Sequence, residues 1–421
     1  MSDQPNVTVE WEPPQQVSVH WPPPDTSYES MVPPEKPHGK WACICRLGGV
    51  GDNLVAASVL RPLKRLGYMN EFISEDPQYV VLENNPFLDK LSVKHGAADI
   101  PQHDMHLWQK WFDMRSREYD FLPNGSRAFV NLSHSIESLC APFMAMTQFW
   151  WGADIRHELF NRNYLEAAHD IVFGPGNVPY EFGPLYFSSE EEKAKALATK
   201  KEVSDKFGDG RVIAWCVSGT RIDKIWPHAP MTIARVIKEL GVPVVLIGAP
   251  GKDYEMATQI LEVVVMHNSS KDGISIAIST DPNKPSFPVR RSLSFCQQAD
   301  LLVAPDTGPS WACAFEDMPK VILTSHASPN NITKHWPRTI TLHGDPQKVG
   351  CPVQGKHIGC HRLHDTIDTC CPNATNTGAA CISEISVECA VAAIKSALGD
   401  KPALEQMRTK WASNSIVTDD F

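Results

Sequence analysis

Most of the chain alternates between two kinds of segment, which differ in how apolar and polar residues are spaced. Short apolar runs, such as residues 212–217 and 301–303, have the length and composition of buried strands. Turn residues follow each run, and then apolar residues recur at helical spacing. Strands that alternate with helices in this way predict an α/β fold with doubly wound, Rossmann-like parallel sheets.

Breaks in this pattern predict four parts of the chain. Residues 1–40 form a proline-rich arm, and residues 41–180 form a first Rossmann-like domain. A stretch rich in Gly and Pro, residues 174–189, reads as the linker to a second Rossmann-like domain at residues 190–398. Residues 399–421 form a C-terminal tail or helix, with one or two amphipathic turns.

The proline-rich arm contains a repeat with a period of ten residues. Each copy alternates like a strand, carries a tryptophan (Trp11 or Trp21), and stops at proline. One interpretation is a disordered leader. The other is an extended arm that packs on its own domain or mediates self-association, because two tryptophans are costly to leave in water.

Composition narrows the class of protein. A chain of 421 residues with 42% hydrophobic and 21% charged residues is typical of a globular protein with two domains. The formal charge of −10 argues against tight binding to nucleic acid or to an anionic membrane. No apolar run reaches the ~18 to 20 residues of a membrane span, and the N-terminus has no signal-peptide pattern. We therefore expect a cytoplasmic protein.

Three turns at predicted strand ends carry candidate chemistry. Asp306-Thr307-Gly308 opens a helical pattern, where backbone N–H groups favour an anion such as a diphosphate, although the same residues also serve as helix caps. Ser218-Gly219-Thr220 is followed by Lys224, and small hydroxyls with one lysine suit a phosphate. The third turn is the glycine-rich segment at residues 48–51.

In combination these segments resemble the heptosyltransferase family of glycosyltransferases, which have the GT-B architecture. The chain has Gly51-Asp52-Asn53-Leu54 where that family has Gly-Asp-x-Leu. It then has Ser218-Gly219-Thr220 with Lys224-Ile225-Trp226-Pro227, and finally Asp306-Thr307-Gly308. The resemblance runs from about Trp41 to Leu398, and it is specific in the combination of motifs.

The resemblance implies an inverting, metal-independent transfer of a sugar, by default a heptose, from a nucleotide-diphosphate donor to an acceptor hydroxyl, with no cofactor required. Asp52 would be the base, and its alternative role is a helix cap. The donor-binding residues would be Ser218, Gly219, Thr220, Lys224, Asp306, Thr307, Gly308 and Trp311. The acceptor and loop residues would be Gly49, Gly51, Asn53, Ser133 and His134.

Other functions stay open at this point. Trp311 stands where the family usually has histidine, so the donor can differ. The acceptor can be a glycan, a modified nucleic-acid base or a protein, and a catalytically inactive GT-B binding module is a further alternative. A dehydrogenase is disfavoured, because Asn53 and Leu54 stand where Gly-x-Gly-x-x-Gly needs its third glycine.

Half of the twelve cysteines lie near the C-terminal end of the sequence. Without a signal peptide they are expected to be thiols, and Cys43, Cys45, Cys216 and Cys296 to pack in the core. Cys351, Cys360, Cys381 and either Cys370 or Cys371 could bind one structural zinc. Their spacing is not that of a zinc finger, so unligated thiols and a local disulfide are the alternatives.

Overall fold

The structure is a computed structural model that describes residues 39–419, except for 76, 94–104, 134–135, 137–150, 208–209, 220, 277–287, 352–354, 362–370, 372–373, 376–377 and 400–414. The proline-rich arm lies outside the described residues, and so do both of its tryptophans. Residues Gly39–Phe421 form one compact unit.

The first sheet is small and entirely parallel. Its strands β1 (Trp41–Cys45), β2 (Met69–Ser74), β3 (Lys90–Val93) and β4 (Phe129–Asn131) have the order β3-β2-β1-β4. The central strand β1 is almost wholly buried, as its sequence Trp-Ala-Cys-Ile-Cys requires, because helices cover parallel sheets on both faces. Its carboxyl end releases the glycine-rich turn.

The second sheet is larger and parallel except at one edge. Its strands are β5 (Ile213–Cys216), β6 (Val244–Ile247), β7 (Ile274–Ile276), β8 (Leu301–Pro305), β9 (Lys320–Thr324), β10 (Thr339–Gly344) and β13 (Ser415–Asp419), in the order β13-β10-β9-β8-β5-β6-β7. The centre of this sheet is β8 and β5, whose carboxyl ends carry Asp306 and Ser218. Ligands bind at that edge in sheets of this kind.

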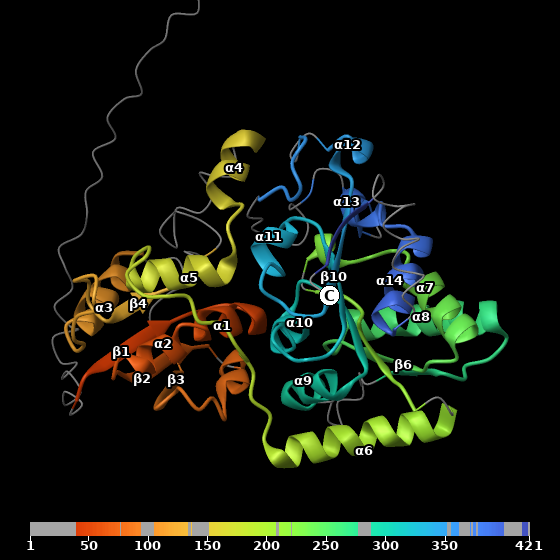
Figure 1. Cartoon of the computed structure of the whole chain (residues 1–421), viewed down its shortest axis with the longest axis horizontal. Coiled ribbons are helices and arrows are strands. Elements are labelled where there is room, and N and C mark those ends of the chain that lie inside the picture. The colour runs from red at the N-terminus through yellow and green to blue at the C-terminus, as the bar shows by residue number, and fades with distance from the viewer. Residues whose placement is uncertain are drawn as a thin grey trace, which may run out of the picture. The chain divides into compact units, whose positions relative to one another are not determined.

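Helices alternate with these strands along the chain (Figure 1). In the first half they are α1 (Val50–Ala57), α2 (Leu60–Arg65), η2 (Gln78–Leu82), α3 (Met105–Ser116), α4 (Ala153–Phe160) and α5 (Tyr164–Phe173). In the second half they are α6 (Glu190–Phe207), η4 (Ile222–Lys224), α7 (Ala229–Leu240), α8 (Lys252–Asn268), α9 (Val289–Gln298), α10 (Gly308–Ala312), α11 (Pro329–Ile332), α12 (Pro346–Val349), α13 (Ala380–Ser383) and α14 (Val387–Ala397). A small antiparallel pair, β11 (Ala374–Thr375) and β12 (Gly378–Ala379), precedes α13. The predicted α/β class with two parallel sheets is confirmed.

The C-terminal end differs from the expected helix. Leu404, Met407 and Trp411, around which amphipathic turns were expected, lie outside the described residues. Residues Ser415–Asp419 form β13, which pairs antiparallel with β10. The tail therefore extends the second sheet by one edge strand.

Hydrogen bonds join residues of the first half to helices that flank the second sheet. The Asn331 side-chain amide on α11 donates to Phe160 O at 2.7 Å and to Arg162 O at 2.8 Å. The buried Arg290 guanidinium on α9 donates to Val80 O at 2.9 Å. Each of these side chains donates to a backbone carbonyl that would otherwise bind water. These contacts therefore hold the strand ends of the two halves in place relative to each other.

Candidate active site

The glycine-rich turn is held from inside by Asn53. This side chain is fully buried, and its amide nitrogen donates to Gly48 O at 3.1 Å and to Gly49 O at 2.9 Å. Its Oδ1 accepts a hydrogen bond from Ser74 at 2.7 Å. Asn53, predicted as a loop or acceptor residue, therefore stabilises the turn from the buried side, through hydrogen bonds to its backbone carbonyls.

Asp52 lies on the first turn of α1 with two partners. Its Oδ2 accepts the Gly49 N–H at 2.7 Å, which is a capping contact, and its Oδ1 lies 2.9 Å from Nη2 of Arg46. The Asp52 side chain is 40% exposed, whereas Arg46 is buried. Desolvation raises the pKa of Asp52, but Arg46, Lys224 and the Gly49 N–H outweigh it and hold that pKa below its usual value. Asp52 is thus a capped carboxylate that stays ionised at neutral pH.

The beginnings of α1 and α10 touch each other, although some 250 residues separate them in sequence. A Cβ atom added to Gly51 would lie 2.9 Å from Cδ1 of Trp311, and one added to Gly308 would lie 2.5 Å from Cγ1 of Val50. Only glycine allows this approach. The contact brings the Asp-Thr-Gly turn of the second sheet next to the Gly-Asp turn of the first.

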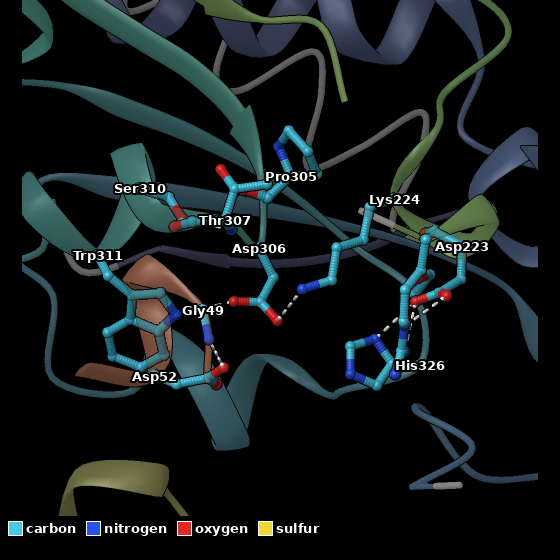
Figure 2. A network of polar contacts seen from close by, with 12 residues as sticks. Gly49, Asp52, Asp223, Lys224, Pro305, Asp306, Thr307, Ser310, Trp311 and His326 are labelled. Carbon is cyan, nitrogen blue, oxygen red and sulfur yellow. Dashed lines mark hydrogen bonds and ion pairs between the residues drawn. The ribbon is translucent and has the colours of Figure 1, made fainter. Parts of the chain in front are cut away.

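Asp306 connects Lys224 and Trp311. Nε1 of Trp311 donates to its Oδ1 at 2.8 Å, and Nζ of Lys224 lies 3.4 Å from its Oδ2 (Figure 2). Thr307, not Asp306, is the N-cap of α10, and its N–H donates to Oγ of Ser310 at 3.0 Å. The capping role considered for Asp306 is therefore wrong, and its carboxylate faces Lys224 instead.

Of the remaining predicted donor-binding residues, Gly219 lies against the same lysine. Gly219 packs so closely that an added Cβ would lie 2.6 Å from Cδ of Lys224. The Ser218 hydroxyl donates to Asp253, whose other oxygen accepts the Ala249 N–H at 2.8 Å. Ser218 therefore ties the turn to the start of α8 and, through Asp253, to the loop that follows β6. Thr220 lies outside the described residues.

The expected acceptor residues at the end of β4 are described in part. Oγ of Ser133 accepts the Leu47 N–H at 2.9 Å, so Ser133 braces the glycine-rich turn. His134 lies outside the described residues.

Sequence reasoning missed three titratable residues at this site. Arg46, the partner of Asp52, was not singled out, because an arginine beside a glycine turn has no distinctive pattern. Asp223 and His326 were also missed: the buried Asp223 lies beside Lys224 in sequence, and its Oδ2 lies 2.9 Å from Nδ1 of His326. No short motif joins two residues about a hundred positions apart.

The cysteine-rich end is described incompletely. Desolvation and the nearby Cys360 and Cys371 thiols raise the pKa of the Cys381 thiol, and Cys351 adds to this effect. Cys370 lies outside the described residues, and among the described ones no group of three His, Cys, Asp or Glu side chains is arranged to hold a metal ion. Structural zinc at Cys351, Cys360, Cys370 and Cys381 stays a prediction, which elemental analysis can test. The core role of Cys43, Cys45, Cys216 and Cys296 is confirmed, since all four are buried.

No helix among the described residues is both long and apolar enough to cross a membrane.

Comparisons with known proteins bear on the fold. No protein-family model matches the sequence, and no curated protein does. The structure of E. coli ADP-heptose lps heptosyltransferase II is similar, with a TM-score of 0.54 and 14% identity over 86% of this chain and 99% of that one. A glycosyl transferase family 9 protein from Veillonella parvula DSM 2008 is also similar, with a TM-score of 0.53 and 16% identity over 85% of this chain and 97% of that one. The chain therefore has the fold of the heptosyltransferases, as its motifs indicated.

Proposed function

We propose that this protein is an inverting glycosyltransferase that moves a sugar from a nucleotide-diphosphate donor to an acceptor hydroxyl. The observation that carries the proposal is the junction of α1 and α10. There Asp52 from the first half lies within electrostatic reach of Lys224 from the second, on a heptosyltransferase fold. A carboxylate opposite a lysine is the pair of charges that glycosyl transfer to a hydroxyl needs.

In the proposed reaction the acceptor oxygen forms a bond to the anomeric carbon of the sugar. The bond from this carbon to the diphosphate oxygen breaks, and its electron pair leaves with the nucleoside diphosphate. The acceptor proton passes to Asp52, and the configuration at the anomeric carbon inverts. Arg46 keeps Asp52 ionised, so that the carboxylate is ready to accept this proton.

Lys224 would supply the positive charge that the departing diphosphate needs. It lies between Gly219 and Asp306, at the carboxyl ends of the central strands β5 and β8. The Thr307 hydroxyl and the Gly308 N–H complete this proposed diphosphate site, with no metal ion needed as a counter-charge. Asp306, already hydrogen-bonded to Trp311, would meet hydroxyls of the transferred sugar.

The donor we propose to test first is ADP-heptose, because the similar E. coli protein is an ADP-heptose heptosyltransferase. Trp311 is 3% exposed and packs edge to face against Trp336, so it would act on the donor site through Asp306, whose carboxylate its indole N–H holds. The proposed acceptor is a glycan, by default a lipopolysaccharide core, and a modified nucleic-acid base and a protein are the other acceptors to assay. The protein is proposed to act in the cytoplasm.

A thermal-shift panel of ADP, GDP, UDP and CDP tests the donor site directly. A ligand that binds only the folded state raises Tm by mass action. We expect one of the four diphosphates to raise Tm, and its nucleoside to have a much smaller effect. The absence of any shift with all four at millimolar concentration would contradict a nucleotide-sugar site.

A further inference from the structure

Beside Lys224 lies a charged cluster for which the proposed reaction has no role. Asp223 is 2% exposed, and both of its carboxylate oxygens accept from the Arg221 guanidinium, at 3.0 and 2.8 Å. The same carboxylate lies 2.9 Å from Nδ1 of His326. Desolvation alone would raise the pKa of Asp223, but His326 and Arg221 outweigh it and hold that pKa well below its usual value. Asp223 is therefore a fixed negative charge that orients an imidazole.

This arrangement selects one tautomer of His326. A carboxylate accepts a hydrogen bond, so the proton lies on Nδ1 and the lone pair on Nε2. One ring carbon separates the two nitrogens and their outward directions diverge, so Nε2 does not face the carboxylate of Asp223 when Nδ1 does. Figure 2 shows the ring below the Lys224 side chain and next to Asp223. The His326 side chain is 13% exposed, so solvent or a ligand can reach part of it.

The surroundings of His326 keep the ring neutral. Burial lowers its pKa, and the nearby Arg221 and Lys224 lower it further, while Asp223 opposes them. His343 and His361 also lie within electrostatic reach of the ring, and the His361 N–H donates to His326 O at 2.9 Å. A neutral imidazole with Nδ1 engaged offers an acceptor at Nε2 and no donor. It suits a hydroxyl and does not suit a phosphate oxygen.

The position of His326 in the fold favours a ligand contact. It follows β9, the neighbour of the strand that ends just before Asp306, and only Ala327 separates it from Ser328. Ser328 lines a cavity of about 410 Å³ together with His157 and Asn161 of the first half. The chain segment that carries His326 thus connects the end of β9 to a space that both halves line.

We propose that Nε2 of His326 accepts a hydrogen bond from a substrate hydroxyl, with Asp223 as the residue that positions the ring. The inference rests on the proposed glycosyl transfer and adds a hydroxyl-recognition residue to it. The hydroxyl can belong to the transferred sugar or to the acceptor, and binding measurements tell these two sources apart.

The test compares the full chain with His326→Phe, which keeps a ring without nitrogens, and with His326→Gln, which keeps an acceptor near the place of Nε2. The matched control is His335→Phe, since Nε2 of His335 lies 2.8 Å from Glu166, a histidine–carboxylate pair away from Lys224. Tm is measured for each variant. Turnover is followed as ADP released from ADP-heptose in the presence of acceptor, over a range of pH.

We expect His326→Phe to lower kcat/KM ~10-fold or more, with His326→Gln restoring part of the loss and His335→Phe close to the parent. The parent should lose activity as His326 gains a proton on the acid side of neutrality, and the His326→Gln profile should lack that step. Weaker binding of ADP-heptose with unchanged binding of ADP would assign the hydroxyl to the transferred sugar. Unchanged binding of both with lower turnover would assign it to the acceptor.

Equal turnover of the parent and both His326 variants would overturn this inference and leave the glycosyl transfer intact. A loss of turnover that merely follows a loss of Tm, without the difference in pH profile, would also overturn it. If the parent protein turned over no nucleotide sugar, that result would overturn the proposed function itself, and this inference with it.

Discussion

Asp52 shows at the scale of one residue how a structural and a chemical role can coincide. The same carboxylate caps α1 through the Gly49 N–H and pairs with the buried Arg46. A capping carboxylate alone needs no buried guanidinium beside it. The arginine is costly to bury, and its charge offsets the desolvation of Asp52, so the carboxylate carries no proton at neutral pH.

Replacing Asp52 by Asn separates the two roles. The Asn carbonyl oxygen can still accept from the Gly49 N–H, but its NH2 group cannot accept from Arg46, so we expect a moderate fall in Tm, while turnover falls ~100-fold or more through loss of the base. Steady-state kinetics and thermal unfolding check this, with Asp89→Asn, at a surface carboxylate paired with Lys64, as control. A large loss of stability with an unchanged rate per folded molecule would make Asp52 a cap and nothing more.

Replacing Lys224 by Ala tests the diphosphate contact. A charge-assisted contact predicts that ADP binds more weakly by about 1.5 to 3 kcal/mol, while adenosine binds as it does to the parent. Calorimetry measures both ligands, and Lys334→Ala, which removes a lysine paired with Glu166, serves as control. Equal losses for ADP and adenosine would place Lys224 away from the phosphates.

At the scale of elements, the site depends on two helix beginnings that meet at glycines. A Cβ on Gly308 would overlap Val50, so Gly308→Ala must push α10 and α1 apart. We expect it to destabilise the protein by about 1 to 3 kcal/mol, the usual cost of overpacking. Val50→Ala in the same chain should recover part of the loss, because it removes the overlapping methyl groups.

Thermal unfolding of the two single variants and of the double variant measures how strongly the effects of Gly308→Ala and Val50→Ala on stability depend on each other. Gly152→Ala is the control, since an added Cβ there would meet nothing within 4 Å. If the changes in stability caused by Gly308→Ala and Val50→Ala simply added, the two side chains would not be in steric contact, which would contradict the close packing of α1 and α10.

Strand β9 begins at a lysine that is completely buried. Nζ of Lys320 donates to Glu316 O at 2.8 Å and to Met318 O at 2.9 Å. Burial lowers the pKa of Lys320 to about 8, although the nearby Cys313 and Glu316 oppose the shift. Between pH 8 and the ordinary lysine pKa of about 10.4, the unfolded chain keeps a proton that the folded chain has released.

The folded state therefore gains stability from Lys320 as pH rises through this window, by about 1 to 3 kcal/mol. Lys320→Met removes the titration, so the Tm of the parent relative to this variant should rise between pH 7.5 and pH 10. Lys334→Met, at an exposed lysine, should follow the parent. An identical pH dependence of Tm for the parent and Lys320→Met would contradict the lowered pKa.

At the scale of the whole molecule, the sequence predicts most of the fold and only part of the site. Runs such as residues 301–303 mark buried strands, because a parallel sheet covered on both faces needs continuous apolar residues. The edge strand β13 was missed, since a short segment at the chain's end reveals its pairing only through contact with β10. The motifs located the three turns, because glycine and capping residues are local requirements.

The motifs could not predict contacts between distant segments or the burial of single side chains. His326 pairs with Asp223 through folding that brings separate strand ends together. Arg46 and Asp52 lie in one turn, but the sequence of that turn does not show that the arginine is buried beside the carboxylate. The identity of an aspartate does not show whether its side chain is buried or exposed, so the burial of Asp223 could not be inferred either. The cysteines show the same limit: their spacing in sequence says little about which thiols approach Cys381.

The central claim, transfer of a sugar at the junction of α1 and α10, is tested most directly by turnover of a nucleotide sugar. The full chain is incubated with ADP-heptose, and in parallel with GDP-, UDP- and CDP-sugars, in the presence of glycan, nucleic-acid and protein acceptors. Release of nucleoside diphosphate and the mass gained by the acceptor are measured together. The account predicts equal amounts of diphosphate and glycosylated acceptor with one donor, and their loss in Asp52→Asn. No release from any donor, or release that Asp52→Asn leaves unchanged, would contradict it.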